Sequence, residues 1–278
     1  MGASKRPPDY QAVAIDVIAE ILTNGDVSLI GLGEVHVPDV QMLQHAIVGP
    51  LQVDVTTTAD TSVAFLYKPD IVTPIAVHAL IDHYGRKTLC RGLEALIALN
   101  DGSLDFELFL CHWPSRMRGV QALRERNQLA ISLSVRLDSA YANDFPVVVM
   151  GDFNDEPFDQ SMTDHLRGSR DRQYVIDDTR LLYNPFWRQL GERQDISDES
   201  GGRLAPGTHF YRSDQLTHWL TVDQALVSRE FLGRNKWVLN EAETGPIQLP
   251  PLITEKGRLK RGFDHFPIVV TFDRPDQT

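Results

Sequence analysis

Residues 147–155 read VVVMGDFND, an apolar run followed directly by glycine, two acids and an amide. The apolar run predicts a buried β-strand that ends near Met150. Glycine, aspartate and asparagine are also the usual residues of a turn after a strand, so the motif alone fits a simple turn. The interpretation as a site depends on whether the rest of the chain repeats this arrangement.

The arrangement does recur along the chain. Polar groups border other apolar stretches: Glu34 follows VSLIGLG, His112 follows DFELFLC, Asp223 lies in LTVDQALVS, and Asp264 with His265 precedes FPIVVTF. Each group alone has an ordinary explanation, such as a solvated strand end, a core histidine or a hydrogen-bonded turn. Loops at the strand ends of a rigid sheet are where sites are usually built. We therefore expect these groups to converge at one rim of the fold.

The chemistry of these groups indicates a cation. Carboxylates and imidazoles that crowd together repel or desolvate one another unless a cation or a substrate balances them. Oxygen ligands without paired cysteines suit Mg²⁺ or Mn²⁺ rather than structural zinc. Histidines beside such a site can transfer protons near neutral pH. The residue types therefore point to metal-assisted hydrolysis of a phosphate ester.

Length and composition favour one large domain over residues 1–278, with two small domains as the alternative. Because 42% of the residues are hydrophobic and 8% aromatic, there is ample material for a packed core. Residues 1–8 read as a flexible, charged tail. The formal net charge of −11 argues against a non-specific nucleic-acid coat, because an acidic surface repels a phosphate backbone. A local site with metal ions or arginines can still bind phosphate, so nucleic acid stays open as a substrate.

The two cysteines, Cys90 and Cys111, do not indicate a disulfide framework or a cysteine metal site. Cys111 lies in an apolar stretch and is expected to be a small core residue. The apolar runs are much shorter than a bilayer span, and residues 1–10 carry no apolar signal core. We expect no stable membrane insertion and, by default, a cytoplasmic location; secretion with a removed leader stays open.

The hydrophobic pattern predicts a mixed α/β chain with no internal repeat. Predicted helices cover 10–23 and 117–141, and predicted strands cover 27–32, 61–67, 87–99, 105–113, 147–150, 222–228 and 268–272. Residues 191–207 and 240–262 are expected to be loops. Strict alternation of strands and helices is absent, which argues against a doubly wound sheet.

The helix over 117–141 is expected to be amphipathic. Its apolar positions are Val120, Leu123, Ala130, Leu133, Leu137 and Tyr141, and its charged outer face includes Arg124, Glu125 and Arg126.

Five motifs together resemble the endonuclease/exonuclease/phosphatase family, the superfamily of deoxyribonuclease I. They are LIGLGEV (29–35), HWPSR (112–116), GDFNDEP (151–157), TVDQALVS (221–228) and FDHFPI (263–268), in the family's order and approximate spacing. The resemblance runs from about residue 27 to 272 and is strongest to bacterial members with HWPSR, LYNP and GTxxY segments. It implies a four-layer α/β sandwich, with two mainly antiparallel sheets face to face and helices outside.

The resemblance also implies roles for single residues. Glu34 and Asp264 match metal ligands. Asp152 matches the residue that orients or deprotonates the attacking water, and Asn154 matches the amide that binds phosphoryl oxygens. We expect strand alternation to send Asn154 to the same side as Asp152 and Phe153 into the packing.

The remaining matches concern the phosphate. His265 matches the histidine that contacts the scissile phosphate, and Asp223 matches its carboxylate partner. His112 matches a donor to the phosphate or to the leaving oxygen. Arg91 and Arg116 are weaker matches, as cations that hold phosphate.

The chain departs from the family pattern at its start. Family members open with a strand that carries a metal-linked asparagine, whereas residues 1–26 read as a tail and a helix. Loss of this strand would remove one metal-site partner and leave a sheet edge with which another chain can pair, giving self-association.

The sequence thus predicts an Mg²⁺- or Mn²⁺-dependent phosphoesterase that hydrolyses phosphodiester bonds by metal-assisted water attack. One alternative is a catalytically weakened or inactive phosphate-binding member of the same fold. Another is a lipid phosphodiesterase, which needs exposed apolar loops; Phe186 and Trp187 are the candidates. The sequence does not select among DNA, RNA, lipid and small phosphate esters, because one fold hosts several substrate classes.

Overall fold

The structure is a computed structural model that describes residues 8–58, 61–141, 144–191, 193–194, 203–204, 206–213, 216–233, 236–254 and 259–275. It divides into two compact units, Met1–His112 with Gln248–Asp264, and Trp113–Ile247 with His265–Thr278. Residues 1–7 of the predicted tail and most of the predicted loop over 191–207 lie outside the described residues. The interpretation as one domain stays a prediction.

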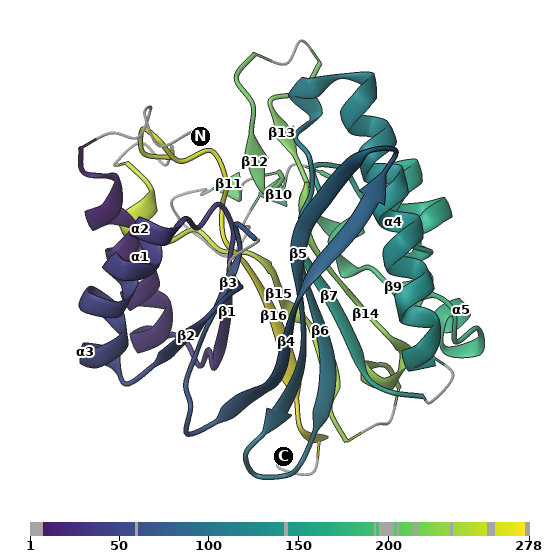
Figure 1. Ribbon diagram of the computed structural model, residues 1–278, viewed down its shortest axis with the longest axis horizontal. Coiled ribbons are helices and arrows are strands. Elements are labelled where there is room, and N and C mark those ends of the chain that lie inside the picture. The colour runs from purple at the N-terminus through teal and green to yellow at the C-terminus, as the bar shows by residue number, and fades with distance from the viewer. Residues whose placement is uncertain are drawn as a thin grey trace. The chain divides into compact units, whose positions relative to one another are not determined.

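The first unit opens with helices packed on a small sheet. Its elements are α1 (Tyr10–Asn24), β1 (Leu29–Leu32), α2 (Val37–Leu43), a π-helical turn (Gln44–Val48), α3 (Gly49–Leu51), β2 (Asp54–Thr56) and β3 (Ala64–Tyr67). The strands are antiparallel in the order β1-β3-β2, with the helices on one side (Figure 1). Apolar residues from both layers form the core between them: Ile18, Leu22, Leu43, Ile47, Val53 and Leu66.

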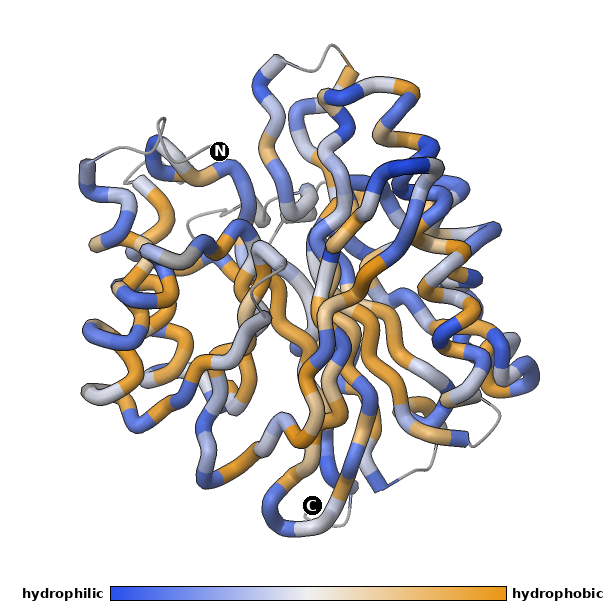
Figure 2. Tube along the Cα trace, viewed as in Figure 1, coloured by the Kyte–Doolittle hydropathy of each residue, from blue (hydrophilic) through white to orange (hydrophobic). Residues whose placement is uncertain are grey.

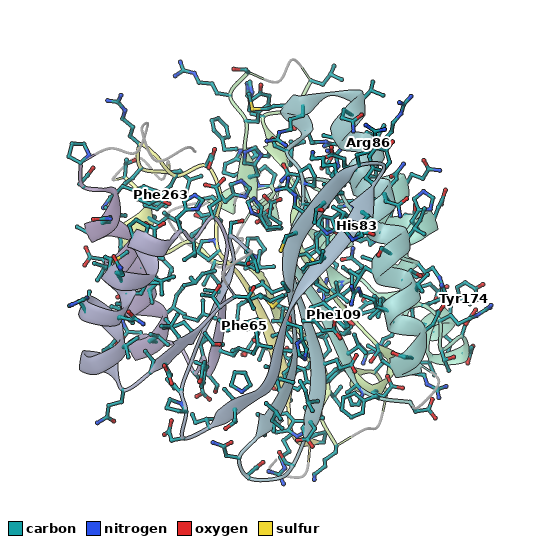
Figure 3. All side chains as sticks on the ribbon, viewed as in Figure 1. Phe65, His83, Arg86, Phe109, Tyr174 and Phe263 are labelled. Carbon is teal, nitrogen blue, oxygen red and sulfur yellow. The ribbon has the colours of Figure 1, made fainter. Side chains whose placement is uncertain are left out.

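Three longer antiparallel strands complete the first unit: β4 (Val72–Tyr84), β5 (Lys87–Leu99) and β6 (Asp105–His112), followed late in the chain by a 3₁₀-helix (Pro250–Leu252). Gly31 on β1 faces β6 so closely that a β-carbon there would lie 2.5 Å from Cδ1 of Leu110. The β1-β3-β2 sheet therefore packs face to face with the β4-β5-β6 strands. Phe65 on β3 and Phe109 on β6 are fully buried (Figure 3).

The second unit is built around a sheet in the order β7-β14-β9-β8, in which only the β8–β9 pair is parallel. Figure 1 shows α4 beside these strands, and Figure 2 shows apolar residues concentrated along them. Its helices are η3 (Arg116–Arg118), α4 (Val120–Tyr141), η4 (Ser161–His165), α5 (Arg172–Asp177), η5 (Pro185–Gln189) and η6 (Arg229–Phe231). Its strands are β7 (Val147–Asp152), β8 (Gly168–Ser169), β9 (Leu182–Tyr183), β10 (Arg193–Gln194), β11 (Arg203–Leu204), β12 (His209–Phe210), β13 (Trp219–Leu220), β14 (Asp223–Val227), β15 (Val238–Pro246) and β16 (Ile268–Asp273).

Most predicted elements are confirmed, but one strand was not predicted, one predicted loop contains a strand, and one helix face was predicted wrongly. Strand β4 was not predicted, and β15 occupies part of the predicted loop over 240–262. On α4, Val120 and Leu123 are exposed, whereas Glu125 and Arg126 of the predicted outer face are buried. The apolar face of α4 is therefore turned relative to the prediction in its first turns.

The expectation for Cys111 agrees with the structure. Cys111 is buried in β6 and forms no disulfide. Within the described residues the first element is α1, and β1 is the first strand. No helix in the described part of the chain is both long and apolar enough to cross a bilayer.

Candidate functional site

Two aspartates face each other across neighbouring strands of the second unit. Strands β7 and β14 are antiparallel, and their register places Asp152 directly opposite Asp223. Both strands are held by buried apolar residues, since Val147–Val149 and Ala225–Val227 are all enclosed. The sheet thus fixes two carboxyl groups that lie far apart in the sequence at one end of a rigid pair of strands.

Asn154 joins this pair through a tight turn. Its backbone N–H donates to Oδ1 of Asp152 (2.8 Å), and its Nδ2 donates to Oδ2 of Asp152 (2.9 Å) and to the carbonyl oxygen of Trp113 (3.1 Å). Asn154 has a left-handed backbone (φ 53°), which asparagine tolerates better than most residues. The predicted proximity is correct and Phe153 is buried, but the cause is this turn and not strand alternation.

His265 completes the group by pairing with Asp223. Its Nδ1 donates to Oδ2 of Asp223 across 2.7 Å, and both side chains are partly buried. This bond selects the tautomer and fixes the ring, so the Nε2 atom is presented in a defined direction. The predicted histidine–aspartate pair is present.

His209 is a neighbour of this pair that the sequence did not single out. It forms an isolated antiparallel bridge with His265, and the centroids of their rings are 4.3 Å apart. It also stacks with Tyr211. The only sequence signal was its place inside the GTxxY segment, since β12 is too short to show periodicity.

The donor atoms lie close enough to hold a divalent ion. One ligand atom from each of Asp152, Asp223 and His265 lies within 4.8 Å of the others. Asp264, a predicted metal ligand, belongs to the first unit, and its place at this site stays a prediction. Two facing carboxylates make each other's ionised form less favourable unless a cation balances their charge. Carboxylate and imidazole donors suit Mg²⁺ or Mn²⁺, so these residues fit the predicted ion.

Arg116, predicted to hold phosphate, lies in an acidic surrounding. Its guanidinium pairs with Asp159 (2.7 Å) and lies 3.9 Å from carboxylate oxygens of Asp155 and Glu156. These contacts give it a structural partner close to the turn after Asn154. Phosphate binding by Arg116 stays a prediction.

Behind the turn lies a buried ion pair. Arg126 contacts Oδ2 of Asp155 at 2.8 Å, and the two side chains are 4% and 1% exposed. Ser161 donates to the same carboxylate, and Gln224 of β14 donates to the carbonyl oxygen of Asp155. Burial raises the pKa of Asp155 above its usual range, although the bonds from Arg126 and Ser161 oppose this shift.

The other predicted site residues belong to the first unit. Glu34 is exposed and has a left-handed backbone (φ 55°), which is uncommon for glutamate and is often found at functional sites. Ser62 links its surroundings to His112, because the N–H of Val35 donates to the Ser62 carbonyl oxygen (2.8 Å) and the Ser62 hydroxyl lies 3.2 Å from Nδ1 of His112. Arg91 lies on β5, partly buried. Convergence of these three groups with the second unit stays a prediction.

Comparison with known proteins identifies the family. A family model described as the endonuclease/exonuclease/phosphatase family matches residues 13–274. The chain therefore belongs to this family. No curated protein sequence matches it.

Solved structures show the same fold. A humanised D. rerio TDP2 is similar with a TM-score of 0.64 and 15% identity, over 96% of this chain and 94% of that one. A mannosyl-6-phosphatase of Bacteroides thetaiotaomicron gives 0.61 and 16%, over 95% and 92%. The human nocturnin catalytic domain with bound sulfate gives 0.58 and 13%, over 95% and 86%. The predicted α/β sandwich is confirmed, and family membership supports a hydrolytic phosphoesterase or nuclease type of activity.

Proposed function

We propose that this protein is a divalent-metal-dependent phosphoesterase that hydrolyses phosphodiester bonds by attack of water. The observation that carries the proposal is the joining of the Asp223–His265 pair to the Asp152–Asn154 turn across β7 and β14. A fixed carboxylate, a fixed amide and an oriented imidazole are the groups needed to activate water and to stabilise a charged phosphoryl group.

We assign each residue a role in the reaction from its position and its hydrogen bonds. Asp152, held by two bonds from Asn154, orients the water and accepts its proton. Asn154 and His265 donate to the phosphoryl oxygens, and Asp223 stabilises the cationic form of His265. His112 donates to the phosphate or to the leaving oxygen, and Arg91 and Arg116 hold the phosphate. These last three roles rest on the family match.

Glu34 and Asp264 would hold the ion, as the family match implies. Asp152 and Asp223, which lie together beside His265, offer further carboxylate oxygens. When bound, a divalent ion supplies Lewis-acid stabilisation of the charge that develops on the phosphate oxygens. Mg²⁺ and Mn²⁺ are the ions that the oxygen-rich donor set favours.

The test is hydrolysis of bis(4-nitrophenyl) phosphate by the full chain. We expect turnover that needs Mg²⁺ or Mn²⁺ and stops with EDTA. Asp152→Asn and His265→Gln should each lower kcat by about 10²–10⁴-fold, because each removes a proton-transfer or donor group. Exposed residues of the same types, in Asp70→Asn and His78→Gln, are the matched controls and should keep full activity.

The contrary result is a folded protein without metal-dependent turnover on this ester, DNA, RNA, phospholipid or sugar phosphates. That outcome would favour the phosphate-binding alternative. The lipid alternative loses one of its two candidate exposed apolar residues, since Phe186 is only 1% exposed and belongs to the core. Trp187 lies under the guanidinium of Arg170.

Natural substrates should be compared in parallel. One similar structure is TDP2 complexed with a single-stranded DNA product, and another is a mannosyl-6-phosphatase. Single-stranded DNA and mannose 6-phosphate are therefore the first diester and monoester to test. We expect the diester to be preferred.

A further inference from the structure

A three-residue segment, Gly207-Thr208-His209, contacts both the segment that carries Asp223 and the segment that carries His265. Asp223 and His265 are 42 positions apart in the sequence, so something must hold their two segments in register. Both segments bond to Thr208, a residue that is fully buried.

The hydroxyl of Thr208 holds the segment that carries Asp223. Its Oγ1 accepts the backbone N–H groups of Val222 (3.1 Å) and Asp223 (3.0 Å). Strand β14 begins at Asp223, so these are N–H groups at the start of the strand. A buried N–H without an acceptor is strongly unfavourable, and this hydroxyl therefore fixes where the strand starts.

The backbone of Thr208 holds the segment that carries His265. Its carbonyl oxygen accepts the N–H of Phe266 (2.7 Å), the residue directly after His265. Stacking of Phe266 on Trp219, with ring planes 9° apart, fastens the same segment from the side. Thr208 thus bonds both to the segment that carries Asp223 and to the segment that carries His265.

Gly207 allows the close approach that these bonds need. A β-carbon at this position would lie 2.7 Å from the carbonyl oxygen of Leu220, closer than real β-carbons come. The N–H of Thr208 donates to that same carbonyl oxygen (2.9 Å). The Gly-Thr order is therefore required by the packing against β13.

We propose that Thr208 is a positioning residue for catalysis, whose hydroxyl sets the geometry of the Asp223–His265 pair. The kinetic part of this inference rests on the proposed function. The geometric part does not, because the state of the pair can be observed without a substrate.

The test compares Thr208→Val, which keeps the shape and removes the hydroxyl, with Thr208→Ser, which keeps the hydroxyl. We expect kcat of Thr208→Val to fall about tenfold or more with little change in KM, since a misplacement of about 1 Å can reduce a rate about a hundredfold. Thr208→Ser should keep most of the wild-type kcat. If the valine variant does not fold, Thr208→Ala takes its place.

The matched control is Thr244→Val. Thr244 is also buried, and its hydroxyl also accepts a backbone N–H, from Thr271, and donates to a backbone carbonyl. It lies in the β15–β16 sheet and bonds to neither partner of the pair. We expect this variant to lose stability but to keep kcat.

The substrate-free readout is the histidine side-chain ¹⁵N spectrum at a pH where the imidazole is neutral. His265, assigned from its loss in His265→Gln, should be protonated on Nδ1 in the wild type and in Thr208→Ser, and should show mixed tautomers in Thr208→Val. Wild-type tautomer and kcat in Thr208→Val would overturn the inference, as would equal losses in Thr208→Ser or Thr244→Val. An inactive wild type would count against the proposed function only, because the spectrum still decides the inference.

Discussion

At the scale of single residues, the buried Arg126–Asp155 pair supports the turn that carries Asn154. Asp155→Asn would leave the guanidinium of Arg126 enclosed without its counter-charge. We expect the free energy of unfolding to fall by about 3–5 kcal/mol, the usual effect of removing one partner of a buried pair. Urea denaturation of the variant, with the exposed Asp70→Asn as control, measures this loss; a loss equal to the control's would contradict it.

His209 is expected to contribute through its ring nitrogens and not through packing alone. His209→Phe keeps an aromatic ring against His265 but removes both nitrogens. We expect kcat/KM to fall about tenfold or more, within the range of a lost proton-transfer or donor group. The exposed His78→Phe is the control, and thermal unfolding checks the fold. Wild-type kinetics in His209→Phe would assign the ring to packing.

At the scale of elements, the β5–β6 pair leaves no room at Gly92. This residue is opposite Cys111, and a β-carbon on it would collide with the backbone carbonyl oxygen of Leu110. We expect Gly92→Ala to lower the free energy of unfolding by about 1–3 kcal/mol through overpacking. Gly49→Ala is the control, because nothing lies within 4 Å of that site and it begins a helix. Equal stability of the two variants would contradict the packing account.

Elements with an unbroken apolar period were predictable from the sequence, whereas interrupted ones were not. Strand β4 shifts register at Pro74/Ala76 and at Ala79/Ile81, and β15 shifts between Asn240 and Gly245. Each shift inserts residues that break the two-residue alternation.

The same limit applies to α4 and to the site. Arg126 looked like a solvated charge because its partner, Asp155, is distant in the sequence. Asp152, Asp223 and His265 were predictable because each borders a clear strand or motif. His209 and Thr208 were not, since their importance lies in bonds across β12, β13 and β14 that no local pattern reveals.

At the scale of the whole molecule, the edge of the β1-β3-β2 sheet suggests self-association. Among the described strands, β1 is bonded to β3 on one side and to no strand on the other. Edge strands offer N–H and C=O groups with which another chain can pair. We predict concentration-dependent dimerisation, measurable by sedimentation velocity over a wide concentration range. A single monomeric species at every concentration would contradict it.

The central proposal is that one catalytic ion is bound beside Asp152, Asp223 and His265. Crystals grown with Mn²⁺, measured for anomalous scattering at the manganese edge, test it most directly. The account predicts one strong anomalous peak bound by Glu34 and Asp264, with Asp152, Asp223 and His265 around it. A well-ordered structure whose manganese lies elsewhere, or in which Glu34 is remote from His265, would contradict it.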